Sequence, residues 1–181
     1  DPTGSDALER SAIRDFNARM KKIARGYKAL LARIPARPVV NQRYEFQLDA
    51  QSLRQWLAEG DLLVDNILLE GGQDELWFFR GYVEIAAARG MAQQFANLAR
   101  QSDAYKAERV SAQAVLNTPP YRRRLALLGA REFEEMRGLA QDVKTNMGRI
   151  LTDGMGRGKN PLDIARSLTE RLGIEGRRAR R

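Results

Sequence analysis

The chain of 181 residues contains no cysteine and no histidine. Without cysteine it can form no disulfide and no thiolate metal site, and it has no cysteine nucleophile. Histidine is the commonest general acid or base and the commonest ligand of transition metals. Its absence excludes a Ser-His-Asp triad and a histidine-bearing zinc site within this chain. Carboxylate-only magnesium chemistry remains open.

Aromatic residues and long hydrophobic runs are also scarce. Aromatic residues make up 7% of the chain, and the mean hydropathy is −0.52. No apolar run approaches the ~20 residues that a membrane span needs, and the opening residues DPTGSDALER lack the apolar region of a secretory signal. With 43% hydrophobic and 30% charged residues, the composition predicts one domain or two small ones with a modest core.

Acidic residues are fewer than basic ones, which gives a formal net charge of +8. The excess is unevenly spread: residues 1–43 carry a net +6, residues 44–118 a net −5, residues 119–156 a net +2 and residues 157–181 a net +5. Basic ends around an acidic middle favour either self-association as a homo-oligomer or two different partners, one acidic and one basic.

Apolar residues recur at helical spacing along most of the chain. A stripe from Leu8 to Ile34 predicts a first long helix, with Ser5 as its N-cap and a basic opposite face. The segment PARPVVNQRYEFQL has no such stripe and predicts an extended, proline-containing linker, with one short strand as a further option. A second helix is expected from the cap Asp49 or Ser52 to Gly71, with a potential interruption at Gly60 and with apolar residues facing inward (Leu53, Trp56, Leu57, Leu62, Leu63, Ile67, Leu68).

Three further helical stretches are expected before the C-terminal turn. The first covers residues 75–100, with Trp77, Phe78, Tyr82, Ile85, Ala86, Met91, Phe95 and Leu98 on its apolar side, and the second covers residues 104–116. Thr118 followed by Pro119 predicts the start of the third, which Gly154, Gly156 and Gly158 should end.

The last helix has a strongly marked start. Asn160 is the expected N-cap, Pro161 suits the first helical position, and Asp163 adds a carboxylate to the first turn. Gly173 fits the left-handed position just after the helix. The predicted fold is therefore all-α, an elongated multi-helix bundle with a helical arm over residues 1–34, a linker over 35–48, a bundle over 49–173 and a basic tail over 174–181.

Two motifs could indicate a chemical site, but in both cases a purely structural role is the preferred interpretation. The sequence GRGKNP has glycines and a lysine but lacks the spacing of a phosphate-binding loop, so it indicates a turn between helices. Glu132, Glu134, Glu135 and Asp142 share one helix and could serve a carboxylate-dependent nuclease. No further ligands are marked, so a solvated helix face is the preferred interpretation, and no metal or cofactor is predicted.

Two arginine clusters are candidate contacts to nucleic acid or to an acidic partner. Arg122, Arg123 and Arg124 follow the double proline at the start of a predicted helix, where three cations oppose the helix dipole. They are equally explained as an exposed first turn. Arg177, Arg178, Arg180 and Arg181 crowd four arginines into the last five residues. The alternative there is a chain that continues into a further segment.

From about Tyr82 to Arg181 the sequence resembles the phage minor head (head morphogenesis) proteins, the Mu F-like minor capsid proteins. A helix ends in Gly156-x-Gly158, Asn160-Pro161 follows, and the next helix carries Ile164, Ala165 and Arg166. The upstream stretch REFEEMRGLAQDVKTNMGRIL is also similar. Family members continue with a further segment where this chain stops at GRRARR, so a fragment is expected.

The resemblance implies structural work rather than catalysis. Proteins of this family enter the procapsid in few copies near the portal and take part in DNA packaging or delivery, and no catalytic residue of theirs maps onto this chain. It implies the portal protein, the major capsid protein and packaged double-stranded DNA as partners, and a location in the virion, with assembly in the bacterial cytoplasm. The alternative is a helical DNA-binding or architectural protein, whose affinity for duplex should fall steeply with salt.

Overall fold

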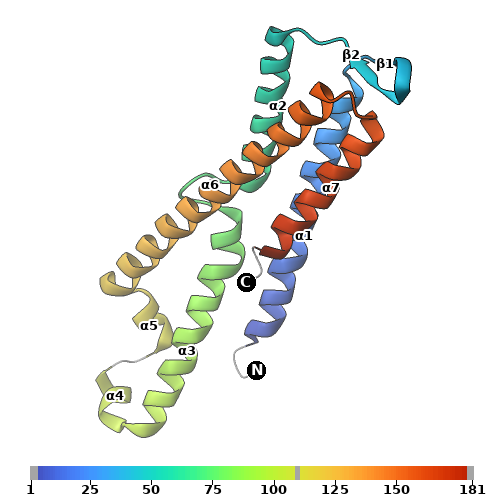
Figure 1. The fold of residues 1–181 in the computed structure, drawn as a ribbon. Helices are drawn as coiled ribbons and strands as arrows, with labels where there is room; N and C mark the ends of the chain where they lie inside the picture. The colour runs from blue at the N-terminus through green and yellow to red at the C-terminus, as the bar shows by residue number, and fades with distance from the viewer. Residues whose placement is uncertain (1–3, 109–110, 179–181) are drawn as a thin grey trace. The chain divides into compact units, whose positions relative to one another are not determined.

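The computed structural model describes residues 4–108 and 111–178, and it confirms the all-α class (Figure 1). In the described residues, seven α-helices account for most of the chain, together with two short strands. The helices are α1 (Ser5–Ala32), α2 (Ala50–Leu68), α3 (Glu84–Gln101), α4 (Asp103–Glu108), α5 (Ala112–Leu116), α6 (Pro119–Gly156) and α7 (Pro161–Arg178), and the strands are β1 (Ala36–Pro38) and β2 (Tyr44–Phe46).

The chain divides into two compact units built from separated segments. Unit 1 combines residues 1–13 with residues 71–135, and unit 2 combines residues 14–70 with residues 136–181. Helices α1 and α6 therefore contribute to both units. The sequence-based division into consecutive ranges did not anticipate units made of discontinuous segments, because local patterns carry no information on which helices pack together.

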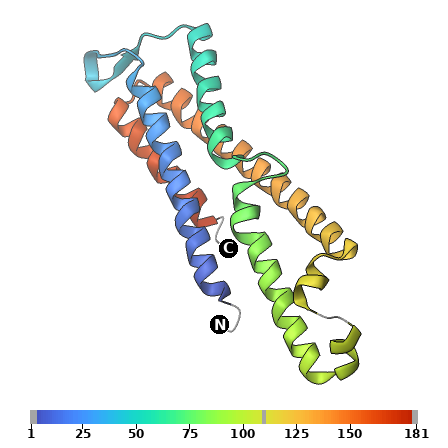
Figure 2. The ribbon, with the colours of Figure 1, turned by 180° about the vertical axis from the view of Figure 1, so that it is seen from behind.

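Unit 2 holds most of the buried apolar side chains. The later part of α1 and helix α7 run side by side in both views (Figures 1 and 2), and α2 and the second half of α6 complete the core. The expected stripe of α1 is buried from Phe16 to Ile34, and Trp56 of α2 donates its indole N–H to the carbonyl of Leu30 at 2.8 Å. The most deeply buried side chains of unit 2 are Ile23, Tyr27, Val64, Leu68, Val143, Met147, Leu151, Ile164, Leu168 and Leu172.

Helices α1 and α2 approach each other closely through two glycines. A Cβ atom added at Gly60 would lie 2.7 Å from Cε1 of Tyr27, and one added at Gly26 would lie 2.2 Å from a methyl carbon of Leu63. Each helix thus offers a glycine to a large side chain of the other. The predicted interruption at Gly60 is wrong, since α2 runs through it to Leu68, and the glycine instead makes room for the tyrosine ring.

Residues 35–48 form a β-hairpin instead of an extended linker. Strands β1 and β2 pair antiparallel, with Arg37 opposite Glu45. A single 3-10 turn over Val40–Gln42 joins them, and Asn41 (φ 66°) and Gln42 (φ 58°) lie in the left-handed region. The backbone hydrogen bonds of a hairpin depend on cross-strand pairing, which three-residue strands cannot signal in a sequence.

Unit 1 has a smaller core around the start of the third helical stretch. Leu76 and Phe79 are buried there, and Phe79 is the first residue of a π-helical turn (Phe79–Val83) that leads into α3. A Cβ at Gly129 of α6 would lie 3.2 Å from the ring of Phe79, so this glycine allows the two segments to pack. Trp77, Phe78 and Tyr82 form a partly exposed aromatic cluster with ring centroids 5.4–6.3 Å apart.

Several boundaries and burial assignments differ from the sequence-based ones. Leu62 was expected in the core but is 62% exposed, and Ile85 and Leu98 of α3 are exposed as well. The stretch 104–116 is split into α4 and α5. Gly173 does not end the last helix, because α7 continues to Arg178. A glycine costs a helix about 1 kcal/mol relative to alanine and does not by itself stop one.

A half-buried ion pair joins α2 to α6 inside unit 2. Lys144 donates from Nζ to Oδ2 of Asp65 at 2.6 Å, and the two side chains are 16% and 35% exposed. Asp61 lies on the same side of α2. Burial raises the pKa of Asp61, the positive charge of Lys144 lowers it, and the negative charge of Asp65 raises it. Burial, followed by the charges of Asp61 and Asp65, also raises the pKa of Tyr27. The positive charge of Lys144 therefore offsets the negative charges of Asp61 and Asp65, which lie near the buried hydroxyl group of Tyr27.

Replacing Lys144 by methionine is expected to lower the free energy of unfolding by about 1–2 kcal/mol near pH 7, because the carboxylates keep their burial and lose their cation. Without Lys144 the pKa of Asp61 rises further in the folded state. A raised carboxyl pKa means that the folded state binds protons more readily than the unfolded state, so stability falls as pH rises through that range. The deficit of the variant should therefore shrink on going from about pH 7 to about pH 4.5.

Urea unfolding at the two pH values measures this effect. The matched control is Lys22→Met, which removes an exposed lysine from the outer face of α1 and should leave stability within about 0.5 kcal/mol of the parent. A deficit of the Lys144 variant that is equal at both pH values would contradict the proposed coupling to the carboxylates.

Candidate functional site

The turn between α6 and α7 is held by a dense set of backbone hydrogen bonds. Gly158 has φ +64° and donates its N–H to the carbonyl of Met155 at 2.9 Å. Asn160 accepts a hydrogen bond from the N–H of Leu162 at 2.9 Å, and α7 begins at Pro161. The predicted cap and first helical position are thus confirmed. The arrangement is a turn between helices, as the sequence GRGKNP indicates.

The hairpin packs directly on this turn within unit 2. The N–H of Tyr44 in β2 donates to the carbonyl of Gly158 at 2.9 Å. A Cβ atom at position 158 would lie 2.9 Å from the carbonyl oxygen of Tyr44, and the positive φ disfavours any other residue as well. Gly158 therefore serves both the helix turn and the close approach of a strand.

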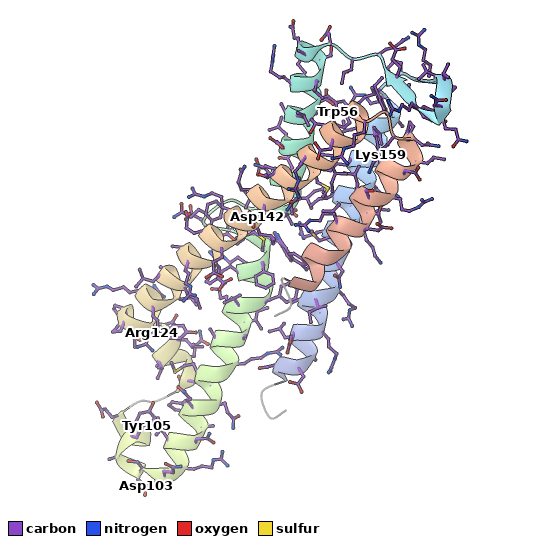
Figure 3. The ribbon with its side chains drawn as sticks, viewed as in Figure 1. Trp56, Asp103, Tyr105, Arg124, Asp142 and Lys159 are labelled. Carbon is purple, nitrogen blue, oxygen red and sulfur yellow. The ribbon has the colours of Figure 1, made fainter. Side chains whose placement is uncertain are left out.

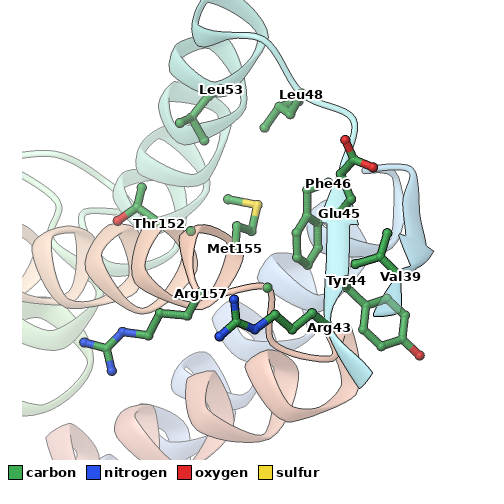
Figure 4. A pocket seen from close by; sticks show the side chains of 12 residues that line it. Val39, Arg43, Tyr44, Glu45, Phe46, Leu48, Leu53, Thr152, Met155 and Arg157 are labelled. Atoms are coloured by element: carbon green, nitrogen blue, oxygen red, sulfur yellow. The ribbon is translucent and has the colours of Figure 1, made fainter. Parts of the chain in front are cut away.

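Beside this contact lies a cavity of about 750 Å³ in unit 2 (Figure 4). The side chains of Phe46, Leu48, Leu53 and Met155 point into it from the hairpin, the start of α2 and the end of α6. Twelve residues line the cavity: Val39, Arg43, Tyr44, Glu45, Phe46, Leu48, Leu53, Thr152, Met155, Gly156, Arg157 and Gly158. Its floor is mostly apolar.

The charges at the cavity are predominantly positive. Arg43 and Arg157 both line it, both are exposed, and neither has an ion-pair partner within the described ranges. The acidic lining residue, Glu45, is held by Arg37 through contacts of 2.8 and 2.6 Å. The two arginines are thus free to receive an anionic group at an apolar surface.

A second, smaller hollow of about 250 Å³ lies beside the same turn. Arg149, Arg157 and Lys159 line it, together with one carboxylate, Asp153. Figure 3 shows Lys159 on the segment between α6 and α7. The basic residues Arg43, Arg149, Arg157 and Lys159 therefore surround the turn, and we call them the turn cations.

The predicted arginine clusters are placed differently. Arg122, Arg123 and Arg124 are exposed in the first two turns of α6, in unit 1, and Arg122 donates to the side-chain oxygen of Asn117 at 3.2 Å (Arg124 is labelled in Figure 3). Arg177 and Arg178 are the last residues of α7, in unit 2. Arg180 and Arg181 lie outside the described residues. The two predicted clusters therefore belong to different units, Arg122, Arg123 and Arg124 to unit 1 and the arginines at the end of α7 to unit 2.

The carboxylates of α6 do not gather into a site. Glu132 is partly buried, and burial, followed by the charge of Glu135, raises its pKa. Glu135 pairs with Arg131 at 2.9 Å, whereas Glu134 and Asp142 are exposed (Asp142 is labelled in Figure 3). Across residues 4–108 and 111–178, no group of three or more acidic residues lies close enough to hold a metal ion. The structural interpretation of these residues as a helix face agrees with this geometry.

The cavity itself was missed at the level of sequence. Its lining comes from three segments, residues 39–48, Leu53 and residues 152–158, that only the fold brings together. The available signals were Arg43 beside two aromatic residues of the hairpin, and the basic residues of GRGKNP. Neither signal indicates a cavity by itself, because the apolar floor belongs to other segments.

Comparison of the chain with protein-family models, with curated proteins and with solved structures finds no match. None of the helices in the described part of the chain combines the length and apolar character needed to cross a membrane. A functional assignment therefore depends on the resemblance seen in the sequence and on the geometry of the turn and its cavity.

Proposed function

We propose that this chain is a structural minor head protein of a tailed phage or prophage, and that it acts in procapsid assembly and DNA packaging or delivery at the portal region. The observation that carries the proposal is the segment from Gly156 to Arg166. In this segment the sequence resembles the minor head family, and the same residues form one ordered unit: a glycine turn, an asparagine cap and a helix start with Ile164 in the core.

The geometry around this segment suits a docking role better than catalysis. The turn supports a hairpin, a mostly apolar cavity and the turn cations, and these features suit the binding of a partner. Long amphipathic helices, such as the 38-residue α6, provide extended faces for assembly. The partners proposed are the portal protein, the major capsid protein or both.

The alternative is a helical DNA-binding or architectural protein, and the turn cations favour it. They offer several contacts to phosphate in unit 2, and exposed Arg122, Arg123 and Arg124 offer others in unit 1. Binding of this kind releases counterions, so affinity for a duplex should fall steeply between 50 and 200 mM salt, by roughly 10³-fold or more if about six phosphates are contacted.

Co-purification separates the two proposals. The tagged chain would be co-expressed with the portal protein of the phage or prophage that encodes it and purified with and without nuclease treatment. We expect a complex that survives the nuclease, because docking between proteins needs no DNA bridge. The control is the same tag on an unrelated basic helical protein. A complex that disappears after nuclease treatment would favour the DNA-binding alternative, and the absence of any complex would refute docking on the portal.

A further inference from the structure

We propose that the cavity between the hairpin and the α6–α7 turn binds a protein segment that places a large apolar side chain next to a carboxylate. The inference names the chemistry of a partner and goes beyond the proposed function. It applies whether that partner is a portal protein, a capsid protein or another chain.

The apolar part of the proposed ligand follows from the floor of the cavity. Phe46, Leu48, Leu53 and Met155 point into the hollow and are only partly buried by the rest of the chain (Figure 4). The hollow has a volume of about 750 Å³ and is open to solvent, so a side chain of a partner can enter it from outside. An apolar side chain inserted there would remove both surfaces from water, which is the main favourable term in association.

The carboxylate follows from the two arginines of the lining. Arg43 and Arg157 come from different segments, and Figure 4 shows their side chains on the same side of the cavity, below Met155 and Phe46. Neither is paired within the described ranges, whereas Glu45 is already occupied by Arg37. A guanidinium group matches the planar, bidentate geometry of a carboxylate. The charge of the cavity is therefore complementary to an acidic residue.

A peptide fits these observations better than DNA does. Contacts to a phosphate backbone need cations on an accessible surface, and they gain nothing from an apolar hollow. A peptide segment can fill the hollow with one side chain and present a neighbouring carboxylate to the arginines. DNA bound by the arginines is the competing outcome of the test.

The test is a selection of random twelve-residue peptides displayed on phage against the immobilised full chain. We expect the enriched peptides to share a leucine, isoleucine, methionine or aromatic residue within two positions of an aspartate or glutamate. Binding of a synthetic copy of the best peptide would then be measured by fluorescence anisotropy. Arg43→Glu/Arg157→Glu should weaken it by roughly 10-fold or more, and Met155→Gln should weaken it by roughly 3-fold or more.

The matched control is Arg14→Glu/Arg25→Glu, which changes the net charge equally at two exposed arginines on the outer face of α1 in the same unit. It should leave peptide affinity within about 2-fold of the parent if local charge is decisive. Circular dichroism checks that all variants fold.

Three results would overturn the inference. The first is a set of enriched peptides without carboxylates. The second is an equal loss of peptide affinity in Arg43→Glu/Arg157→Glu and in the control Arg14→Glu/Arg25→Glu. The third is a selection in which no peptide binds the parent chain better than it binds the Arg43→Glu/Arg157→Glu variant. A 30-base-pair duplex that displaces the peptide and loses affinity in that variant alone would assign the arginines to DNA. These outcomes are independent of co-purification with the portal protein, so failure here would not by itself refute the proposed function.

Discussion

Replacing Leu168 by alanine is expected to lower the free energy of unfolding by about 2–5 kcal/mol. Leu168 is a residue of α7 with no exposed surface, and it lies among the buried side chains of unit 2. Removing three carbon atoms there forfeits the transfer of apolar surface from water, and it leaves a cavity that the neighbouring helices cannot fully close. Chemical unfolding followed by circular dichroism at 222 nm measures the loss.

The same helix supplies a control for this prediction. Leu162 is 73% exposed in the first turn of α7, so Leu162→Ala removes the same atoms from water-exposed surface. Its effect should stay within about 0.5 kcal/mol. If the two substitutions had equal effects, α7 would not pack in unit 2 as described.

Replacing Gly60 by alanine is expected to destabilise the protein by about 1–3 kcal/mol, even though alanine is the better helix former. The added methyl group would lie 2.7 Å from Cε1 and 2.9 Å from Oη of Tyr27, and that tyrosine is only 1% exposed. A rigid ring enclosed on all sides cannot move without displacing its neighbours. Either the ring or the spacing between α1 and α2 must change.

Replacing Gly138 by alanine should change the free energy of unfolding in the opposite direction. Gly138 lies on an exposed face of α6, and a Cβ there meets no atom within 4 Å. The substitution should stabilise the protein by about 0.5–1 kcal/mol, because alanine has less backbone entropy to lose on folding. Parallel urea titrations of the two variants give the comparison. Stabilisation by both substitutions would show that the helices do not meet at Gly60.

Helix positions were predictable because the relevant signals are local. The spacing of apolar residues in α1, the aspartate cap of α2 and the Asn160-Pro161 start of α7 each act within one or two turns. Burial was less predictable, as Leu62 shows. It follows the apolar pattern of α2 but lies 62% exposed, because the width of a buried stripe depends on how many neighbours the helix has.

Local sequence patterns could not predict the hairpin or its cavity. Two strands of three residues each, Ala36–Pro38 and Tyr44–Phe46, carry too little alternation to predict pairing. Gly158 looked like an ordinary turn residue, yet it also has to accommodate a strand. The candidate site therefore follows from contacts between segments more than a hundred residues apart.

By itself the sequence determined the all-α fold class and excluded the sites that need histidine or cysteine. The absence of histidine and cysteine, the helical periodicity and the strong cap at Asn160 act locally or by composition alone. Only the tertiary structure decided that Gly60 and Gly26 make room for large side chains of the facing helix. It also decided that the positive charge of Lys144 lies near two carboxylates of α2. The same holds for Arg43 and Arg157, which line one mostly apolar cavity. These features depend on which faces of distant segments meet, and that is settled by packing of the whole chain rather than by the preferences of any one segment.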